Sequence, residues 1–128
     1  MFSHIMVGSN DIERSQGFYD ALFGSIGGNP GRKDHKGRLA YLYNGGIFMV
    51  SPPIDGQPAT HGNGSTIGFT MESPQQVHAW QEAGVAAGGT AIEDPPGVRH
   101  GSLGPLYLAY LRDPDGNKLC ALHRIQAE

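Results

Sequence analysis

Three side chains that can move protons or attack a carbon atom lie on predicted strands near the two ends of the chain. His4 lies in a short strand over Phe2–Val7, and Tyr110 and Cys120 lie in the two arms of a predicted hairpin. Alternation along the first strand places His4 on the same face as Gly8. The hairpin pairs Tyr110 with Cys120, and cross-strand partners share a face. These residues could supply a general base, a thiolate nucleophile and a proton donor.

Each of these candidates also has a purely structural interpretation. The imidazole of His4 could simply bond a backbone carbonyl, and Cys120 could be a small buried apolar side chain, which is the common fate of a lone cysteine. Nucleophilic catalysis by Cys120 requires a base within hydrogen-bond reach, and sequence spacing does not establish one. Both residues are therefore candidates for catalysis or for packing.

A cluster of basic residues in segment 31–38 favours an anion-binding lid. Four of the nine basic residues lie there: Arg32, Lys33, Lys36 and Arg38. The planar guanidinium group suits a carboxylate or a phosphate, so Arg38, next to a predicted strand, is the best candidate for substrate binding. An exposed mobile loop is the alternative interpretation.

Further candidate binding residues lie in and before the last hairpin. Arg99 and His100 occupy a predicted loop that leads into it, where they could bind a substrate carboxylate or supply a proton. Tyr41, Tyr107 and Tyr110 could stack on a flat ligand. The alternatives are a solvated loop for the first pair and ordinary core or edge packing for the tyrosines.

The elements that hold these residues occur twice, at an offset of 62 residues. The strand Thr66–Phe69 repeats the first strand, with Ile67 in the place of Ile5. An amphipathic helix follows each strand, and Trp80 of the second helix takes the place of Phe18 in the first. The sequence therefore predicts an internal repeat, although short amphipathic patterns could recur by chance.

Capping signals predict where the two helices begin and end. Asn10 and Ser73 are each followed three residues later by Glu or Gln, which is the spacing of a capping box. Gly24 and Gly84 predict the two helix ends, because glycine favours the position after the last helical turn.

A hairpin follows the Gly-rich loop after each helix. The predicted hairpins are Leu39–Tyr43 with Ile47–Ser51, and Leu106–Arg112 with Asn117–His123. If Asn44 and Gly45 form a two-residue turn, Met49 faces Ala40, whereas a slip of one residue would send Arg38 to the other face. We expect one domain, with a first module over residues 1–52, a linker over 53–64 and a second module over 65–124, because neither half alone has a large enough core.

Composition narrows the class of protein. The chain has 128 residues, with 20 Gly, 9 Pro, one Cys and a net charge of −3 at pH 7. The negative charge gives no attraction to nucleic acid or to an anionic membrane. One cysteine cannot form an internal disulfide, and neither a basic leader nor a long apolar run occurs. We expect a soluble, cytoplasmic protein that binds neither nucleic acid nor membrane.

The sequence resembles the vicinal-oxygen-chelate superfamily, which includes glyoxalase I, the bleomycin and fosfomycin resistance proteins and the extradiol dioxygenases. The resemblance is carried by the opening His4–Val7, by the helix with Asp11, Ile12, Phe18 and Tyr19, and above all by Tyr110–Leu119, which contains Asp-Pro-Asp-Gly-Asn. It implies an α+β fold in which two tandem βαβββ modules form an open half-barrel sheet around a cleft. It also implies a homodimer.

The resemblance implies where a metal ion would lie. Metal-using relatives place ligands at four strand positions, which are held here by His4, by Met49 or after a slip Ser51, by Thr66 and by Cys120. Only His and Cys are good ligands for zinc or nickel, and a catalytic zinc site normally has three protein ligands. We therefore expect a weak, incomplete site for a divalent metal at His4 and Cys120 and no metal cofactor, with Met49 and Thr66 as candidate substrate-binding residues.

Two functions stay open. One is an enzyme of the lyase, isomerase or dioxygenase type that acts on a small carbonyl or diol compound, with His4 and either Tyr110 or Cys120 transferring protons. The other is a protein that binds a small molecule or drug without turnover. The missing carboxylate ligands favour the second function, and the retention of His4 favours the first. The glyoxalase reaction itself needs a metal to stabilise an enediolate and a glutamate to move protons, and this chain keeps neither requirement intact.

Overall fold

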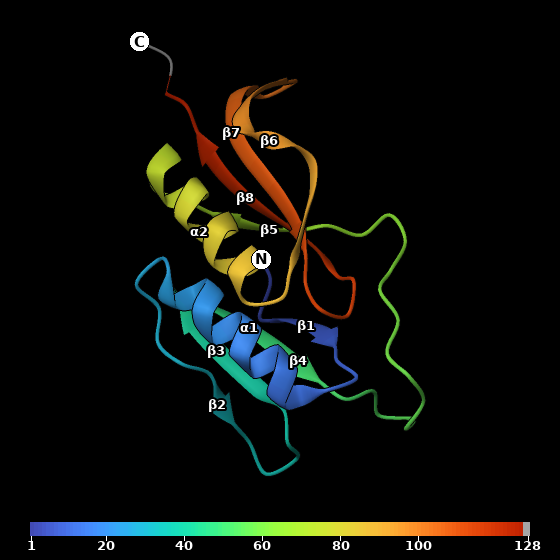
Figure 1. The fold of residues 1–128 in the computed structure, drawn as a ribbon. Coiled ribbons are helices and arrows are strands. Elements are labelled where there is room, and N and C mark those ends of the chain that lie inside the picture. The colour runs from blue at the N-terminus through green and yellow to red at the C-terminus, as the bar shows by residue number, and fades with distance from the viewer. Residues whose placement is uncertain (127–128) are drawn as a thin grey trace.

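The computed structural model describes residues 1–126 as two similar modules joined by an irregular linker. The first module consists of β1 (Ile5–Gly8), α1 (Ile12–Gly24), β2 (Arg32–Lys33), β3 (Leu39–Tyr43) and β4 (Gly46–Ser51). The second module consists of β5 (Ile67–Thr70), α2 (Pro74–Ala86), β6 (Thr90–Gly101), β7 (Gly104–Arg112) and β8 (Lys118–Arg124). The linker over residues 52–66 runs along the outside of the molecule (Figure 1).

The two modules have the same topology. The strand order is β1-β4-β3-β2 in one sheet and β5-β8-β7-β6 in the other, and both sheets are open. In each sheet the first and last strands of the module pair in parallel, whereas the other pairs are antiparallel. The offset of 62 residues holds from Ile5 to Ile67 and from Ile12 to Pro74. The structure confirms the α+β fold of two tandem βαβββ modules and shows that their strands form two separate four-stranded sheets.

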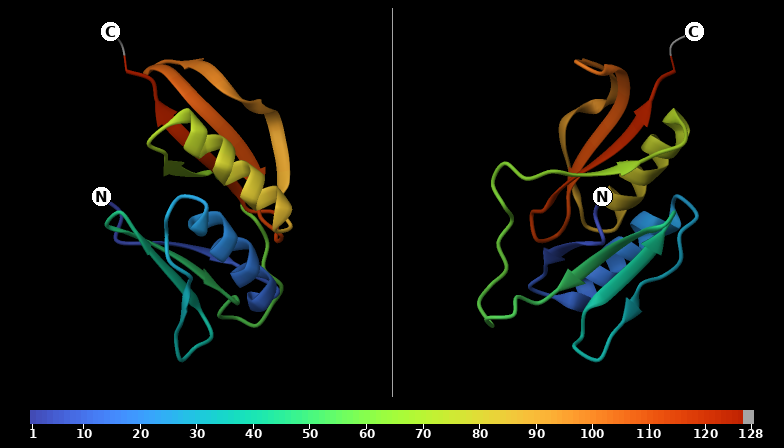
Figure 2. Two further views of the ribbon diagram at one scale, coloured as in Figure 1. Left: turned by 60° about the vertical axis from the view of Figure 1, so that its left-hand side comes forward. Right: turned by 180° about the vertical axis from the view of Figure 1, so that it is seen from behind.

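Each helix covers one face of its own sheet, and the two helices pack against each other (Figures 1 and 2). Phe18 of α1 and Trp80 of α2, the equivalent positions of the repeat, are at most 1% exposed. The rings of Phe48 and Phe69 lie 5.4 Å apart and join the two halves into one core. Within residues 1–126 neither helix has the length and apolar character needed to span a membrane.

The first helix begins one residue later than the sequence predicts. Its N-cap is Asp11, whose carboxylate accepts a hydrogen bond from the Arg14 amide at 3.1 Å. Asn10, the predicted cap, instead bonds the backbone of Ala59 in the linker through its side-chain amide. The local pattern cannot reveal this difference, because the competing partner of Asn10 lies 49 residues away.

The second helix begins at its predicted cap but does not end at Gly84. Ser73 caps it by accepting from the Gln76 amide at 3.1 Å, and the helix continues to Ala86. A Cβ atom at Gly84 would lie 2.5 Å from Leu111 Cδ2 and 3.1 Å from Leu22 Cδ1. Gly84 is therefore required for the close approach of the two helices and β7, which is a tertiary constraint and not a capping signal.

Both predicted hairpin registers are confirmed. Ala40 pairs with Met49, and the two-residue turn of Asn44 and Gly45 has φ values of 49° and 81°, which suit Asn and Gly in a tight hairpin. In the second module Tyr110 pairs with Cys120, and the chain turns between Asp113 and Asn117. The faces of these strands are thereby fixed.

The segment that carries Arg99 and His100 is a strand, although the sequence predicts a loop. Both residues belong to β6, where they pair with Leu106 and Pro105 of β7. The register of β6 shifts between Ile92 and Gly97, so that a bulge interrupts the strand. This bulge contains two prolines, which hide the strand from pattern analysis because proline is depleted in regular sheets.

Candidate functional site

A cavity of about 970 Å³ opens where β1 and β4 end and the linker passes beside them. Apolar side chains supply much of its wall: Met6, Val7, Pro52, Pro53, Ile54 and Pro58. Its charged lining residues are Lys36, Arg38 and Asp55. A smaller cavity of about 300 Å³ also touches Met6 and Gly8 and reaches Lys118 of the second module. An apolar cavity of this size with a few polar groups is typical of a small-molecule site.

The turn between β2 and β3 holds Arg38 at this cavity. Asp34 Oδ1 accepts the amides of Lys36 and Arg38 at 2.8 and 3.0 Å, which closes the turn. Asp34 Oδ2 then accepts from Arg38 Nε at 2.7 Å. This ion pair uses only one of the five N–H donors of the guanidinium group, so the two terminal amino groups stay available for a carboxylate or phosphate.

The carboxylate of Asp34 stays charged over a wide pH range. The backbone hydrogen bond from Arg38 is the main cause that lowers its pKa to about 2, with the Arg38 side chain and the Lys36 amide acting in the same direction. A carboxylate that accepts several hydrogen bonds favours its ionised form. The orientation of Arg38 through Asp34 therefore persists throughout the neutral range.

The predicted binding residue Met49 does not itself line this cavity, but it pairs with Met6, which does. It is the register partner of both Met6 and Ala40, so it lies in the middle of the open face of the first sheet. Met6 is 42% exposed and lines the cavity. The two methionines form a flexible apolar surface, which adapts readily to an organic ligand.

Tyr110 and Cys120 lie together on the open face of the second sheet, next to a charged pair. Lys118 forms an ion pair with Glu93, and its Nζ lies 4.8 Å from the centre of the Tyr110 ring. Burial raises the pKa of the Cys120 thiol, and burial also raises the pKa of Tyr110, with Cys120 as the next cause. Glu93 has a φ of 61°, which is uncommon for a non-glycine residue. The protonated thiol is a weak nucleophile in this environment.

The other predicted catalytic residue, His4, is not drawn into a cluster. It is exposed, and its Nδ1 lies 2.8 Å from the hydroxyl of the adjacent Ser3. The thiol of Cys120 is directed at the carbonyl of Ala121, at 3.6 Å, so neither contact joins His4 to Cys120. Thr66 is exposed directly before β5.

Arg99, His100 and Tyr107 do not line the cavity described above. The guanidinium group of Arg99 donates to the carbonyls of Asp94 and Pro95 at 3.0 Å, within its own strand bulge. The Tyr107 hydroxyl lies 2.6 Å from His78 of α2, so this tyrosine is on the helix-covered face and not beside Tyr110. Their roles in binding stay predictions.

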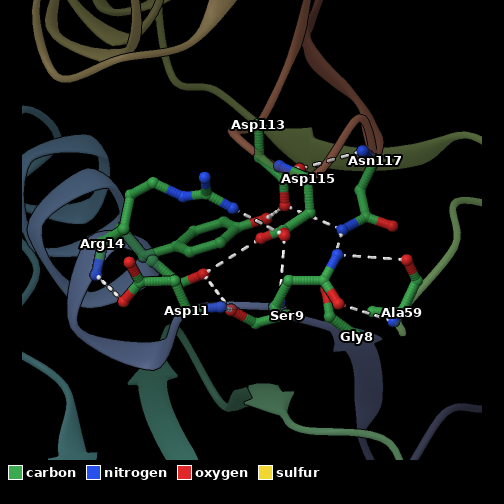
Figure 3. A network of polar contacts seen from close by, with 11 residues as sticks. Gly8, Ser9, Asp11, Arg14, Ala59, Asp113, Asp115 and Asn117 are labelled. Carbon is green, nitrogen blue, oxygen red and sulfur yellow. Dashed lines mark hydrogen bonds and ion pairs between the residues drawn. The ribbon is translucent and has the colours of Figure 1, made fainter. Parts of the chain in front are cut away.

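The turn over residues 113–117 carries out a structural role that joins the two modules (Figure 3). Asp113 Oδ1 accepts the amides of Asp115 and Asn117, each at 2.9 Å. Its Oδ2 accepts from the Tyr19 hydroxyl at 2.5 Å and from Asn117 Nδ2 at 2.8 Å. Burial and the charge of Asp113 raise the pKa of Tyr19, which therefore remains a donor.

The second carboxylate of this turn also bonds the first module. Asp115 accepts from the backbone N–H of Asn10 at 2.9 Å, from Arg14 Nη2 at 2.8 Å and from the Ser15 hydroxyl at 3.3 Å. Its side chain is only 2% exposed. No buried side-chain nitrogen or oxygen atom in residues 1–126 lacks a partner. The side chains of the turn are thus used both to close the turn and to join the modules.

Comparison with known proteins identifies the family. A family model described as the glyoxalase/bleomycin resistance protein/dioxygenase superfamily matches residues 1–121. The chain belongs to this superfamily. A glyoxalase/bleomycin resistance protein from Albidiferax ferrireducens T118 is 60% identical, with a TM-score of 0.93 over 97% of this chain and 99% of that one. Among curated proteins, none matches this chain.

More distant solved structures share the fold. A hypothetical protein from S. aureus is 19% identical, with a TM-score of 0.76 over 97% of this chain and 94% of that one. A glyoxalase-related enzyme from Fulvimarina pelagi is 22% identical, with a TM-score of 0.68 over 97% and 88%. At these identities the likeness establishes the fold alone.

The residues at the superfamily's metal positions do not fit a metal ion. His4, Met49, Thr66 and Cys120 offer two strong ligands, one thioether and one hydroxyl. A catalytic metal site normally has three protein ligands, and these four positions supply only one imidazole and one thiol as strong donors. In the described part of the chain no three His, Cys, Asp or Glu side chains are arranged to hold a metal.

Sequence reasoning did not place the linker at the site. Pro53, Ile54 and Pro58 line the cavity, but the linker has no periodic pattern that could have predicted this. The basic cluster did predict Arg38, and the structure adds Lys36 beside it in the lining. The remaining basic residues of the cluster, Arg32 and Lys33, are exposed in β2.

Proposed function

We propose that this chain binds a small organic molecule with a carboxylate or similar anionic group, and that it does so without a metal ion. The observation that carries the proposal is the presentation of Arg38 at the cavity. Asp34 fixes the guanidinium group through Nε at 2.7 Å and leaves its terminal amino groups for a ligand. A guanidinium group held in this way is suited to a planar anion, because less freedom is lost on binding.

The walls of the cavity support an amphipathic ligand. Met6, Ile54 and three prolines offer rigid or adaptable apolar contacts, whereas Lys36 and Arg38 lie in the same lining. Asp55 is also in the lining, so the cavity is not uniformly cationic. An apolar body with one anionic group therefore matches the cavity better than a polyanion.

The absence of a suitable donor set favours binding over metal-dependent turnover. The four positions that the resemblance assigns to a metal ion hold two strong ligands, fewer than the three of a usual catalytic site. The relative from Albidiferax ferrireducens T118, at 60% identity, bears the same compound name of glyoxalase and resistance protein.

Two matched probes test the proposal. Isothermal titration calorimetry should show that 1-naphthoate binds more tightly than 1-naphthalenemethanol, which has the same ring system without the charge. Arg38→Gln should weaken naphthoate binding by roughly tenfold to a hundredfold, because charged hydrogen bonds are worth about 1.5–3 kcal/mol. The neutral alcohol should bind the variant and the original protein alike.

Arg32→Gln is the matched control, because Arg32 belongs to the same basic cluster but lies in exposed β2. It should leave both affinities unchanged. Equal binding of the two probes, or an equal loss in Arg32→Gln and Arg38→Gln, would refute the anion site. A full equivalent of zinc, nickel or iron retained through purification would refute the metal-free part of the proposal.

A further inference from the structure

The linker is an irregular wall of the cavity. Residues 52–66 contain no helix or strand, and none of their side chains is buried. Gly56 and Gly64 have φ values of 72° and 97°, so glycine is required at two bends of this segment. Pro53, Ile54 and Pro58 of the linker line the cavity, which means that a displacement of the linker would open the site.

Asn10 fastens the linker at one residue. Its side-chain Oδ1 accepts the amide of Ala59 at 2.7 Å, and its Nδ2 donates to the carbonyl of Ala59 at 3.2 Å. Both backbone polar groups of Ala59 are thus bonded by one side-chain amide. This pairing resembles an additional rung of a sheet, although it is made by a side chain on the surface.

Gly8 allows Ala59 to approach the end of β1 closely. A Cβ atom at Gly8 would lie 2.9 Å from the Cβ atom of Ala59, which is too close for two carbon atoms. Figure 3 shows Ala59 next to Gly8 at the edge of the network that joins the modules. The end of β1 therefore accepts the linker only because residue 8 has no side chain.

A second contact lies two residues further along the linker. A Cβ atom at Gly116 would lie 2.9 Å from Nδ1 of His61, so the imidazole rests on the turn that joins the modules. His61 is nevertheless exposed. Two hydrogen bonds from Asn10 to Ala59 thus hold the linker against the first module, and the packing of His61 on Gly116 adds a contact without a hydrogen bond.

We infer that Asn10 is a positioning residue that latches the linker against β1, and that release of this latch opens the ligand cavity. The inference rests on the proposed function, since it concerns access to the same cavity. It also explains why Asp11 and not Asn10 caps α1: the side chain of Asn10 is engaged by Ala59. The latch is exposed to water, so its two bonds can exchange with solvent without the cost of uncovering a buried polar group.

Hydrogen exchange tests the latch without any ligand. In Asn10→Ala the amide of Ala59 loses its acceptor, and its exchange should become roughly tenfold faster or more, because protection of a surface amide reflects local opening. Asn10→Asp keeps an acceptor for this amide and should retain part of the protection. Asn63→Ala is the control: Asn63 is exposed in the same linker, and the structure gives its side chain no hydrogen bond among residues 1–126.

Stopped-flow release of 1-naphthoate tests the opening of the cavity. Asn10→Ala should raise the dissociation rate by roughly threefold to tenfold, since most effects of binding mutations appear in dissociation. Gly8→Ala should have the same effect by pushing Ala59 away, and the added substitution Ala59→Gly should restore the slow rate. Circular dichroism at each step confirms that the variants are folded.

Each outcome decides a separate point. Unchanged exchange at Ala59 in Asn10→Ala overturns the latch. Faster exchange with an unchanged dissociation rate overturns the inference that Asn10 controls ligand access to the cavity, but it leaves the proposed function intact. Failure of the original protein to bind either probe defeats the proposed function and the control of access with it, whereas exchange at Ala59 still decides whether Asn10 holds the linker.

Discussion

The hydroxyl of Tyr19 in the first module donates to the carboxylate of Asp113 in the second module at 2.5 Å. Tyr19 is fully buried, and Asp113 is 4% exposed. Because 94 residues separate them, this bond links distant parts of the chain into one folding unit. The Asp-Pro-Asp-Gly-Asn segment is therefore more than a local turn, because it also connects the two modules.

Removal of this hydroxyl should destabilise the whole protein. Tyr19→Phe leaves a buried carboxylate with one partner fewer, and we expect a loss of about 1–3 kcal/mol in the free energy of unfolding. Urea denaturation followed by circular dichroism measures this loss. Tyr43→Phe is the comparison, because Tyr43 donates to Ile26 within one module at 2.8 Å. A loss in Tyr19→Phe that is no larger than a few tenths of a kcal/mol would show that the joint is not energetically important.

Substitution of two helical glycines should have opposite effects. Gly84→Ala places a methyl group against Leu111 and Leu22, and overpacking of a core costs about 1–3 kcal/mol. Gly17 in α1 is exposed, and a Cβ atom there would have no neighbouring atom within 4 Å, so Gly17→Ala should stabilise the protein by about 0.5–1 kcal/mol. Thermal unfolding of both variants measures the difference. Stabilisation by Gly84→Ala would contradict the close approach of the helices.

Asp34 should control the affinity for anions through Arg38. In Asp34→Asn the carboxylate that accepts from Arg38 Nε is lost, so the guanidinium group regains its freedom. We expect naphthoate to bind roughly threefold to tenfold more weakly, since ordering such a side chain costs about 0.5–1.5 kcal/mol. Calorimetry with the neutral alcohol provides the control. Tighter naphthoate binding would mean that Asp34 competes with the ligand and does not position Arg38.

Cys120 should react slowly with thiol reagents in the native protein. Burial raises the pKa of its thiol, so the protonated form prevails at neutral pH. Iodoacetamide should modify the native protein at least about tenfold more slowly than the urea-unfolded chain at pH 8, because only the thiolate attacks. The native rate should rise as the pH increases, because the thiolate fraction increases. Rapid modification at pH 7 would restore Cys120 as a candidate nucleophile.

Local patterns were sufficient to predict the architecture of the modules. The two hairpin registers follow from turn chemistry at Asn44-Gly45 and at Asp113–Asn117, and both are confirmed. The offset of 62 residues was visible because Ile67 and Trp80 repeat Ile5 and Phe18. These features depend on contacts between residues that are close in sequence or equivalent in the repeat.

Long-range contacts account for what the sequence did not reveal. The prediction of Asn10 as a cap was wrong because its bonds to Ala59 do not show in a local pattern. The prediction of Gly84 as a helix end was wrong because its real constraint is the side chain of Leu111, which lies in another element. Arg38 was predicted at the site from charge, whereas the linker wall has no comparable signal. In the described part of the chain His4 bonds Ser3 and Cys120 bonds the carbonyl of Ala121, so no hydrogen bond links the two, and their catalytic roles stay predictions.

The division of the strands into two open sheets has a consequence for the behaviour of the chain at high concentration. Two separate sheets have four outer strands, β1, β2, β5 and β6, and such strands can recruit a strand from a neighbouring molecule. Three of them are only two to four residues long. The fourth, β6, is interrupted by a bulge with Pro95 and Pro96, which have no amide hydrogen to donate. Each outer strand is thus too short or too irregular to nucleate fibrous aggregation.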